Sequence, residues 1–131
     1  MFPKTSNCIK PPIFGSGTPS IATPATSASE NTFGSWVEID SSLSADSYLF
    51  GFSFQEIYPP GKYVAEIATG LAASEVTFLR LSFTSDNVYI LPIPKYIALG
   101  TRLSVRVAGN GLSGGAQAVY VTTHKYTGLT N

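Results

Sequence analysis

The chain has little charge. Lys and Arg together number eight in 131 residues, Asp and Glu together also number eight, and charged side chains make up 12% of the sequence with a net charge of zero. This fraction is about half of that in a typical soluble domain. No run of like charges occurs, whereas nucleic acids and anionic membranes are bound through clustered Lys and Arg. The sequence therefore predicts no nucleic-acid partner and no membrane partner.

Cysteine and histidine are almost missing. Cys8 is the only cysteine, so no disulfide forms within one chain. His124 is the only histidine, and no Cys or carboxylate stands at ligand spacing from it, which predicts no metal site. The carboxylates are scattered, and "GNGLSGG" (109–115) lacks the lysine and the helix of a phosphate-binding loop. We expect no cofactor and no enzymatic activity, and a structural or surface role for His124.

Long apolar runs are also absent. The first residues, "MFPKTSNCIKPPIFG", contain no apolar stretch of about 7–15 residues as in a secretory signal. No run approaches the roughly 18 residues that span a bilayer. We expect the chain to be made and folded in a cytoplasm.

The residues that are present divide into two zones, and the first is 1–34. It holds five of the nine prolines and shows no period of 2 or 3.6, so it does not fold by itself. It is either a disordered tail or an extended arm that becomes ordered on another subunit. We adopt the arm, because a pure spacer has little reason to carry apolar anchors between prolines. These anchors are Phe2, Ile9, Pro11, Pro12, Ile13 and Phe14.

The second zone is 35–131, where apolar residues recur with the period of two that is typical of strands. The segments are 35–40, 48–55, 62–69, 77–83, 101–107 and 116–126, separated by turn signals such as "YPPGK" and "TSDN". In the clearest segment, Leu103, Val105 and Val107 face the core. The alternate residues Arg102, Ser104 and Arg106 are expected to be exposed. Short strands at this spacing predict an antiparallel β-sandwich or jelly-roll-like domain.

Two prolines interrupt the apolar run "YILPIPKYIALG" (89–100). Pro92 and Pro94 have no N–H for a ladder, so this segment must lie at a sheet edge or leave the sheet. Gly100 permits a sharp turn before the next strand. We expect an edge strand followed by a crossover, with the prolines blocking edge-to-edge pairing.

Aromatic side chains are abundant, with eight Phe, seven Tyr and one Trp. The alternation over 48–55 places Tyr48, Phe50, Phe52 and Phe54 on one face. This ladder is either the inner face of the sandwich, which we favour, or an exposed sugar-binding surface. Other tyrosines are candidates for interface residues, because Tyr is enriched where one end of the ring stays wet. They are Tyr58, Tyr89, Tyr96, Tyr120 and Tyr126.

Two stretches carry a resemblance. "GSWVEI" (34–39) and "YILPIPKYIALGTRLSVRV" (89–107) resemble small β-rich virion proteins of tailed bacteriophages, in which a Tyr-x-Leu-Pro-Ile-Pro strand leads through an Ala-x-Gly-Thr-Arg turn into an alternating strand. The match covers about 25 residues closely and about 95 loosely. This chain departs from the pattern with Lys95 and Tyr96 after the second proline. The matching positions are Tyr89, Leu91, Pro92, Ile93, Pro94, Ala98, Gly100, Thr101 and Arg102.

The resemblance implies a virion protein without enzymatic activity, of the head decoration (cement), head-spike, or tail and fibre type. Such proteins usually form trimers or larger rings. Our leading hypothesis is a capsid decoration protein on the capsid exterior, which binds the major capsid protein and copies of itself as a homotrimer. The alternative is a tail or fibre module that binds a host surface glycan.

Overall fold

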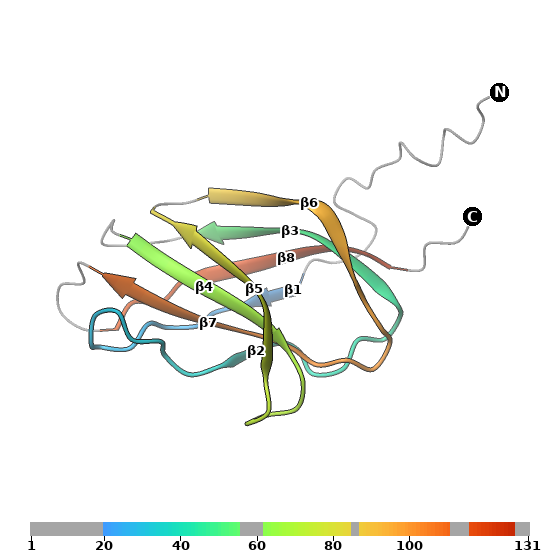
Figure 1. Cartoon of the computed structure of the whole chain (residues 1–131), viewed down its shortest axis with the longest axis horizontal. Helices are drawn as coiled ribbons and strands as arrows, with labels where there is room; N and C mark the ends of the chain where they lie inside the picture. Colours follow the sequence, from blue (N-terminus) through green and yellow to red (C-terminus); the bar gives the residue numbers. More distant parts are fainter. Residues whose placement is uncertain (1–19, 56–61, 85–86, 111–115, 128–131) are drawn as a thin grey trace.

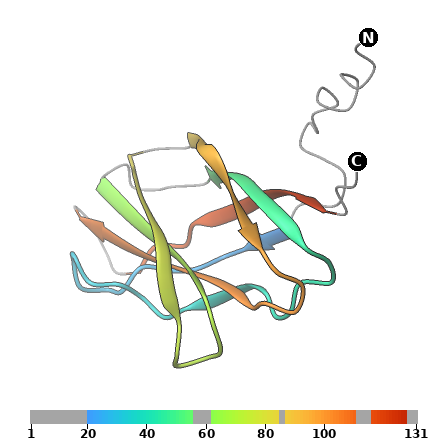
Figure 2. The ribbon, with the colours of Figure 1, turned by 45° about the vertical axis from the view of Figure 1, so that its right-hand side comes forward.

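The computed structural model describes residues 20–55, 62–84, 87–110 and 116–127, and these residues form eight strands and no helix that could span a membrane. The strands make two four-stranded antiparallel sheets, β1-β8-β3-β6 and β2-β7-β4-β5, which pack face to face (Figure 1 and Figure 2). The expected β-sandwich is confirmed. The strands are β1 (Ser20–Ala22), β2 (Val37–Asp40), β3 (Ser47–Gln55), β4 (Lys62–Thr69), β5 (Val76–Phe83), β6 (Asn87–Ile97), β7 (Leu103–Asn110) and β8 (Tyr120–Thr127).

The strand pairing is nested. β1 pairs with β8, β2 with β7, β3 with β6 and β4 with β5, so each strand pairs with its counterpart counted from the other end. Pairing of β3 with β8 and of β4 with β7 completes the two sheets. Eight strands arranged in this way, like a long hairpin rolled into two sheets, form a jelly roll.

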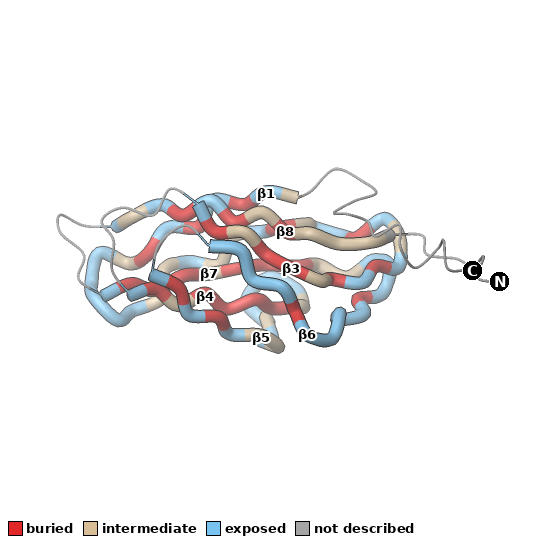
Figure 3. The backbone as a smooth tube through the Cα atoms, turned by 90° about the horizontal axis from the view of Figure 1, so that it is seen from above, coloured by how far each residue is buried: buried red, intermediate tan, exposed pale blue. Residues whose placement is uncertain are grey.

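The core lies between the two sheets. Leu103, Val105 and Val107 of β7 are fully buried, as the alternation predicts. β4 and β7 are buried over most of their length, while β6 is exposed over most of its length (Figure 3). Across the core, the rings of Phe54 on β3 and Phe83 on β5 stack with centroids 4.2 Å apart. Burial of a large apolar side chain contributes about 1.5–3 kcal/mol, so this core is the main source of stability.

The alternation predicted for β3 is wrong in its first half. Phe52 and Phe54 are buried, but Tyr48 is exposed and Phe50 is only partly buried, while Leu49 is fully buried. The reason is a register shift between Leu49 and Gly51, which is a β-bulge that reverses the sides of the residues before it. The four aromatic residues therefore do not form one ladder.

The proline segment lies in an edge strand, as expected. β6 pairs only with β3, and Leu91 to Pro94 lie opposite the single residue Phe50, so the prolines need no ladder donors. After Ile97 the chain crosses to β7 in the other sheet. Gly100 in this crossover has a φ of 85°, which favours glycine.

The sandwich begins earlier than the composition indicates. β1 and the residues after it fall within the zone 1–34, yet Ala22, Pro24 and Thr26 are buried. The backbone N–H of Thr26 donates to Gln117 O at 2.9 Å, and that of Val119 donates to Pro24 O at 2.9 Å. Small residues without a clear period hide this strand from pattern analysis. The arm anchors Phe2, Ile9, Pro11, Pro12, Ile13 and Phe14, and also Tyr58, lie outside the described residues.

Candidate functional site

Three tyrosines form a row on the outer surface of the β1-β8-β3-β6 sheet. The register places Tyr48 of β3 opposite Tyr126 of β8 on one side and Tyr96 of β6 on the other. The rings of Tyr48 and Tyr96 lie 5.4 Å apart between centroids. Phe50 continues the group, because its ring lies 4.6 Å from that of Tyr126. Strand pairing therefore joins aromatic residues from distant parts of the sequence into one cluster.

His124 borders this cluster. Its Nε2 atom lies 2.8 Å from Ser53 Oγ on the neighbouring strand, and its ring lies 6.1 Å from that of Phe50. Burial lowers the pKa of His124 below its ordinary value, so the imidazole is neutral at pH 7. The Ser53–His124 contact adds a neutral polar pair, and a charged group borders the surface at Asp46, which is hydrogen-bonded to Tyr96.

The outward positions of these four strands carry no charged side chain. Their two lysines, Lys95 and Lys125, lie opposite the buried Leu49 in the register and so belong to the inner side. Lys95 Nζ lies 5.3 Å from the ring centre of Phe78 on the other sheet, and Lys125 Nζ donates to Ser20 Oγ at 3.2 Å. We call the outward set the aromatic face. It consists of Ile21, Tyr48, Phe50, Ser53, Val88, Ile90, Tyr96, Tyr120, Thr122, His124 and Tyr126.

Exposed apolar side chains gather on this sheet. Among the described residues, all but two of the exposed large hydrophobic side chains belong to it or to the loop after β6. The exceptions, Leu71 and Val76, flank the β4–β5 turn. Val88 is 57% exposed and Ile90 54% exposed. Where exposed apolar groups form a contiguous patch on a small protein, the patch marks an interaction surface.

The tyrosines selected from the sequence have different places. Tyr96 and Tyr120 are exposed on the aromatic face, and Tyr126 is partly buried within it. Tyr89 is exposed at the β6 edge, but it lies opposite the buried Phe52 and so belongs to the inner side of the register. Sequence analysis missed Tyr48 and Phe50 as surface residues. A glycine within a strand often marks a bulge, so Gly51 was the available signal.

The outer surface of the other sheet is different, because it carries an ion network. Glu66 of β4 is 2% exposed and is bound by Arg80 of β5 and Arg106 of β7. The Nε and Nη2 atoms of Arg106 donate to Glu66 Oε1 at 2.9 and 2.7 Å. The Arg106 guanidinium also lies 4.4 Å from the ring centre of Phe33 and 4.5 Å from that of Trp36. We call this surface the charged face.

Electrostatics keep Glu66 ionised. Burial alone raises the pKa of its carboxyl, but hydrogen bonds from Arg80 and Arg106 and the charges of both arginines outweigh burial, and the pKa lies below its usual value. A second ion-pair group, around Arg102, lies on the same sheet. Arg102 donates to Glu38 at 2.8 Å and to Glu75 at 3.3 Å, so its charge is compensated as well.

The expected exposure of Arg102, Ser104 and Arg106 is therefore wrong. All three alternate with the core residues of β7, but Ser104 is fully buried and the side chains of Arg102 and Arg106 are 12% and 32% exposed. Ion pairs and the rings of Phe33 and Trp36 cover this surface. A period of two shows which way a side chain points and carries no information about what lies over it.

The described residues offer little chemistry. They contain no group of three or more His, Cys, Asp or Glu side chains that could hold a metal ion. The buried carboxylate of Glu66 is engaged by arginines and has no second carboxylate in its network. Ser53 and His124 are hydrogen-bonded to each other and lie among aromatic rings, and we assign them no reaction.

Comparisons with known proteins identify no family. No protein-family model matches the chain, and no curated protein matches it. Among solved structures, the crystal structure of the infectious bursal disease virus VP2 subviral particle matches over 84% of this chain, with 12% sequence identity and a TM-score of 0.31. This chain spans 34% of the length of that chain. At this similarity, nothing about that particle carries over to this protein.

Proposed function

We propose that this chain is a structural protein of a tailed-bacteriophage virion, which binds the outside of the assembled capsid and stabilises it. In this proposal the chain is made in the host cytoplasm, acts on the capsid exterior and catalyses no reaction. Its partners are the major capsid protein and copies of itself, arranged as a homotrimer. The resemblance of residues 89–107 to such proteins supports the proposal, and so does the jelly roll, a fold that viral capsid domains use among others.

The observation that carries the proposal is the uncharged aromatic face. Its outward positions combine exposed Val88, Ile90 and Tyr96 and carry no charged side chain, because the two lysines of these strands lie on the inner side of the register. A free protein gains nothing from such a surface, because exposed apolar groups promote unspecific association. Burial against a partner removes that cost and contributes roughly 25 cal/mol for each Å² of apolar area. We therefore propose that this face docks on the shell.

The size of the face indicates how the chain attaches. Four strands about 4.8 Å apart and about eight residues long, at about 3.3 Å each, cover on the order of 500 Å². A stable interface buries about 800 Å² per partner. One face alone therefore binds weakly, and several linked copies or a second contact are needed for firm attachment. The apolar anchors of the arm are proposed to link the copies, because they are suited to hold a neighbouring copy of the chain. Such a protein stabilises the assembled lattice by mass action, because it binds that state only.

Two valine substitutions on opposite sheets test the proposal. Val88→Asp places a charge in the aromatic face, and Val76→Asp places the same charge on β5, where the valine is 66% exposed. Both sites are exposed, so both variants are expected to fold with nearly unchanged stability. Each protein is mixed with virions assembled without this chain, and the particles are sedimented.

We expect wild type and Val76→Asp to bind the particles equally, with a copy number that follows the capsid subunits. Binding of Val88→Asp is expected to fall at least tenfold. Equal binding of the two aspartate variants would show that the aromatic face is not the docking surface. Failure of the wild-type protein to bind would reject capsid decoration.

The alternative is a tail or fibre module that binds a host surface glycan. The row of Tyr126, Tyr48 and Tyr96 favours it, because sugar rings pack on aromatic rings. However, the planes of Tyr48 and Tyr96 are tilted by 57° and those of Phe50 and Tyr126 by 39°, so the rings pack partly on one another. Attachment to host cells that Tyr48→Ser abolishes and purified surface polysaccharide competes away would favour the alternative.

A further inference from the structure

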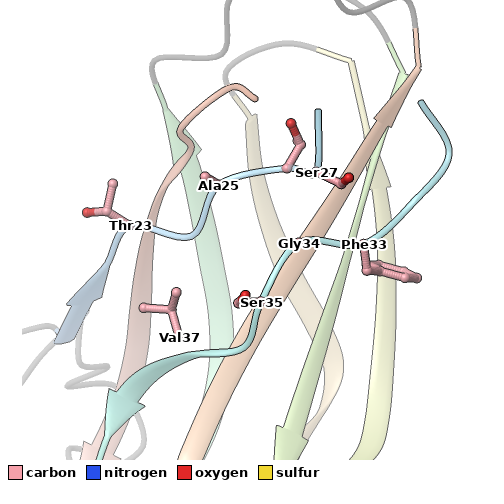
Figure 4. A pocket seen from close by; sticks show the side chains of 8 residues that line it. Thr23, Ala25, Ser27, Phe33, Gly34, Ser35 and Val37 are labelled. Carbon is pink, nitrogen blue, oxygen red and sulfur yellow. The ribbon is translucent and has the colours of Figure 1, made fainter. Parts of the chain in front are cut away.

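An uncharged crevice opens between the chain segment that follows β1 and the segment that leads into β2 (Figure 4). Its volume is about 540 Å³, which lies within the range of ligand pockets. The lining combines hydroxyl groups, small apolar side chains and one aromatic ring. It is formed by Thr23, Ala25, Thr26, Ser27, Phe33, Gly34, Ser35 and Val37.

The two walls of the crevice belong to different sheets. The first wall is held to the segment just before β8 by the Thr26–Gln117 and Val119–Pro24 backbone hydrogen bonds. The second is held to β7 by the Gly34 N–H, which donates to Val107 O at 3.0 Å. β1 and β2 are the edge strands of their sheets. The walls come close at Gly34, where a Cβ atom would lie 2.0 Å from Ala25 O, so only glycine permits this approach. The crevice is thus built into the side of the sandwich.

The chemistry of the lining selects its occupant. No charged side chain lines the crevice, which disfavours an ionic ligand. Ser and Thr hydroxyls donate hydrogen bonds, and the Phe33 ring offers an apolar surface. A proline-rich extended segment is complementary, because it has many carbonyl acceptors and few N–H donors, and such segments dock in aromatic-lined grooves.

The chain itself contains such a segment. Residues 11–19 read "PPIFGSGTP" and include three prolines, two large apolar residues and no charge. They lie within the nineteen residues before Ser20, which span up to about 60 Å when extended. β1 runs from Ser20 towards the crevice, which begins with Thr23. The chain before Ser20 therefore joins β1 at the far end, so an arm from the same chain must reverse direction to reach the crevice.

We propose that this crevice binds the arm of a second copy of the chain, with Ile13 and Phe14 inserted between the two walls. The proposal rests on the self-association in the proposed function and deepens it, because it names the contact that joins two copies of this chain. Exchange of arms in this way links each sandwich to its neighbour. A closed ring results where every copy both gives an arm and receives one.

Disulfide trapping tests the proposal with purified protein and no particles. Cys8 is the only natural thiol and lies in the arm, and Ser35 is exposed on the crevice wall. The first protein, the donor of the arm, keeps Cys8. The second protein carries Cys8→Ser and Ser35→Cys, together with a tag that gives it a different length. The two are mixed under mild oxidation. A matched partner with Cys8→Ser and Ser82→Cys carries its thiol on exposed Ser82 of β5, away from the crevice.

We expect a covalent heterodimer with Ser35→Cys at a yield at least tenfold above that with Ser82→Cys. Ile13→Asp and Phe14→Asp in the donor are expected to reduce the yield to that of the control. A single chain that carries both Cys8 and Ser35→Cys distinguishes the two possible arms. A disulfide within one chain means that the crevice binds its own arm, and a disulfide between two chains means that it binds the arm of another copy. A disulfide formed only within single chains, or equal yields with both partners, would overturn the proposal. Capsid binding is not measured, so this result is independent of attachment to the capsid.

Discussion

The two outer surfaces of the sandwich are built from four strands each, yet they are made in opposite ways. The charged face carries Glu66, Arg80 and Arg106 in a closed network, and aromatic rings cover Arg106. The aromatic face carries no charge at its outward positions and leaves Val88 and Ile90 more than half exposed. On the first surface the buried carboxylate and its arginines pair with each other, whereas on the second Val88 and Ile90 remain open to solvent.

This difference separates stability from attachment. A buried carboxylate with two arginine partners is costly to disturb, because loss of a partner leaves charge without compensation. An exposed ring contributes little to the fold of the free chain, and its area becomes valuable when a partner covers it. We therefore expect substitutions on the charged face to act on folding and substitutions on the aromatic face to act on binding.

The largest effect is expected for Arg106→Ala. The substitution removes two hydrogen bonds to Glu66 and two ring contacts, while Arg80 remains as a partner. The free energy of unfolding should fall by roughly 2–4 kcal/mol, as measured by urea denaturation. Lys62→Ala, on an exposed residue of the same sheet, is the control and should change stability by less than about 0.5 kcal/mol. Similar midpoints for the two variants would mean that the network does not hold the charged face together.

The second effect is a pH dependence from Glu66. Its folded-state pKa lies below the unfolded-state value of about 4.5, so its contribution to stability is complete above that value and is lost as the pH falls through the folded-state pKa. Glu66→Gln should therefore lower stability at neutral pH and flatten the acid limb of the stability curve. Thermal melts across the acid range give the comparison. Parallel curves for wild type and variant would contradict this assignment.

A smaller effect is expected from His124 on the aromatic face. Burial lowers its folded-state pKa below the unfolded-state value of about 6.5. The folded state therefore takes up this proton less readily than the unfolded state, and stability decreases as the pH falls from about 6.5 until it passes the folded-state pKa. His124→Gln should remove this slope, which urea midpoints between neutral and mildly acid pH would reveal. The idea fails if the variant keeps the slope of the wild type.

The smallest effect on folding is expected for Tyr96→Ser. Tyr96 is 49% exposed on an edge strand, its ring contact with Tyr48 contributes about 0.5–1.5 kcal/mol, and its hydroxyl is hydrogen-bonded to the exposed Asp46. The melting temperature should change little. Binding to virions assembled without this chain, the proposed partner of the aromatic face, should decrease clearly in a sedimentation assay. Leu71→Ser, which removes a 76% exposed side chain at the β4–β5 turn, is the control for binding. A loss of folding without a loss of binding would reverse the division between the two faces.

Much of the fold was predictable, because alternation shows which side chains of a strand point towards the core. Leu103, Val105 and Val107 are buried as the pattern predicts, and Pro92 and Pro94 lie at an edge since proline has no donor for a ladder. Both inferences rest on properties of single residues or of one strand.

The rest depends on contacts between distant residues. The bulge at Gly51 turns Tyr48 and Phe50 outward. An alternating pattern in the sequence does not show where such an additional residue is inserted into a strand. The cover of Arg106 comes from Phe33 and Trp36, which precede it by about seventy positions. The aromatic face and the crevice arise from pairings such as β1 with β8, which join the two ends of the described chain.

The nested pairing also determines the order in which the surfaces are finished during synthesis. The sheet of the charged face has all four strands once β7 has left the ribosome, whereas the other sheet waits for β8, which lies between β1 and β3. Until β8 arrives, β1 has no neighbour in its sheet, and β8 also supplies Tyr126 and His124. Such long-range pairings form late. A chain that lacks β8 therefore displays only the part of the aromatic face that β3 and β6 form, and the face is complete only when β8 has paired with β1 and β3.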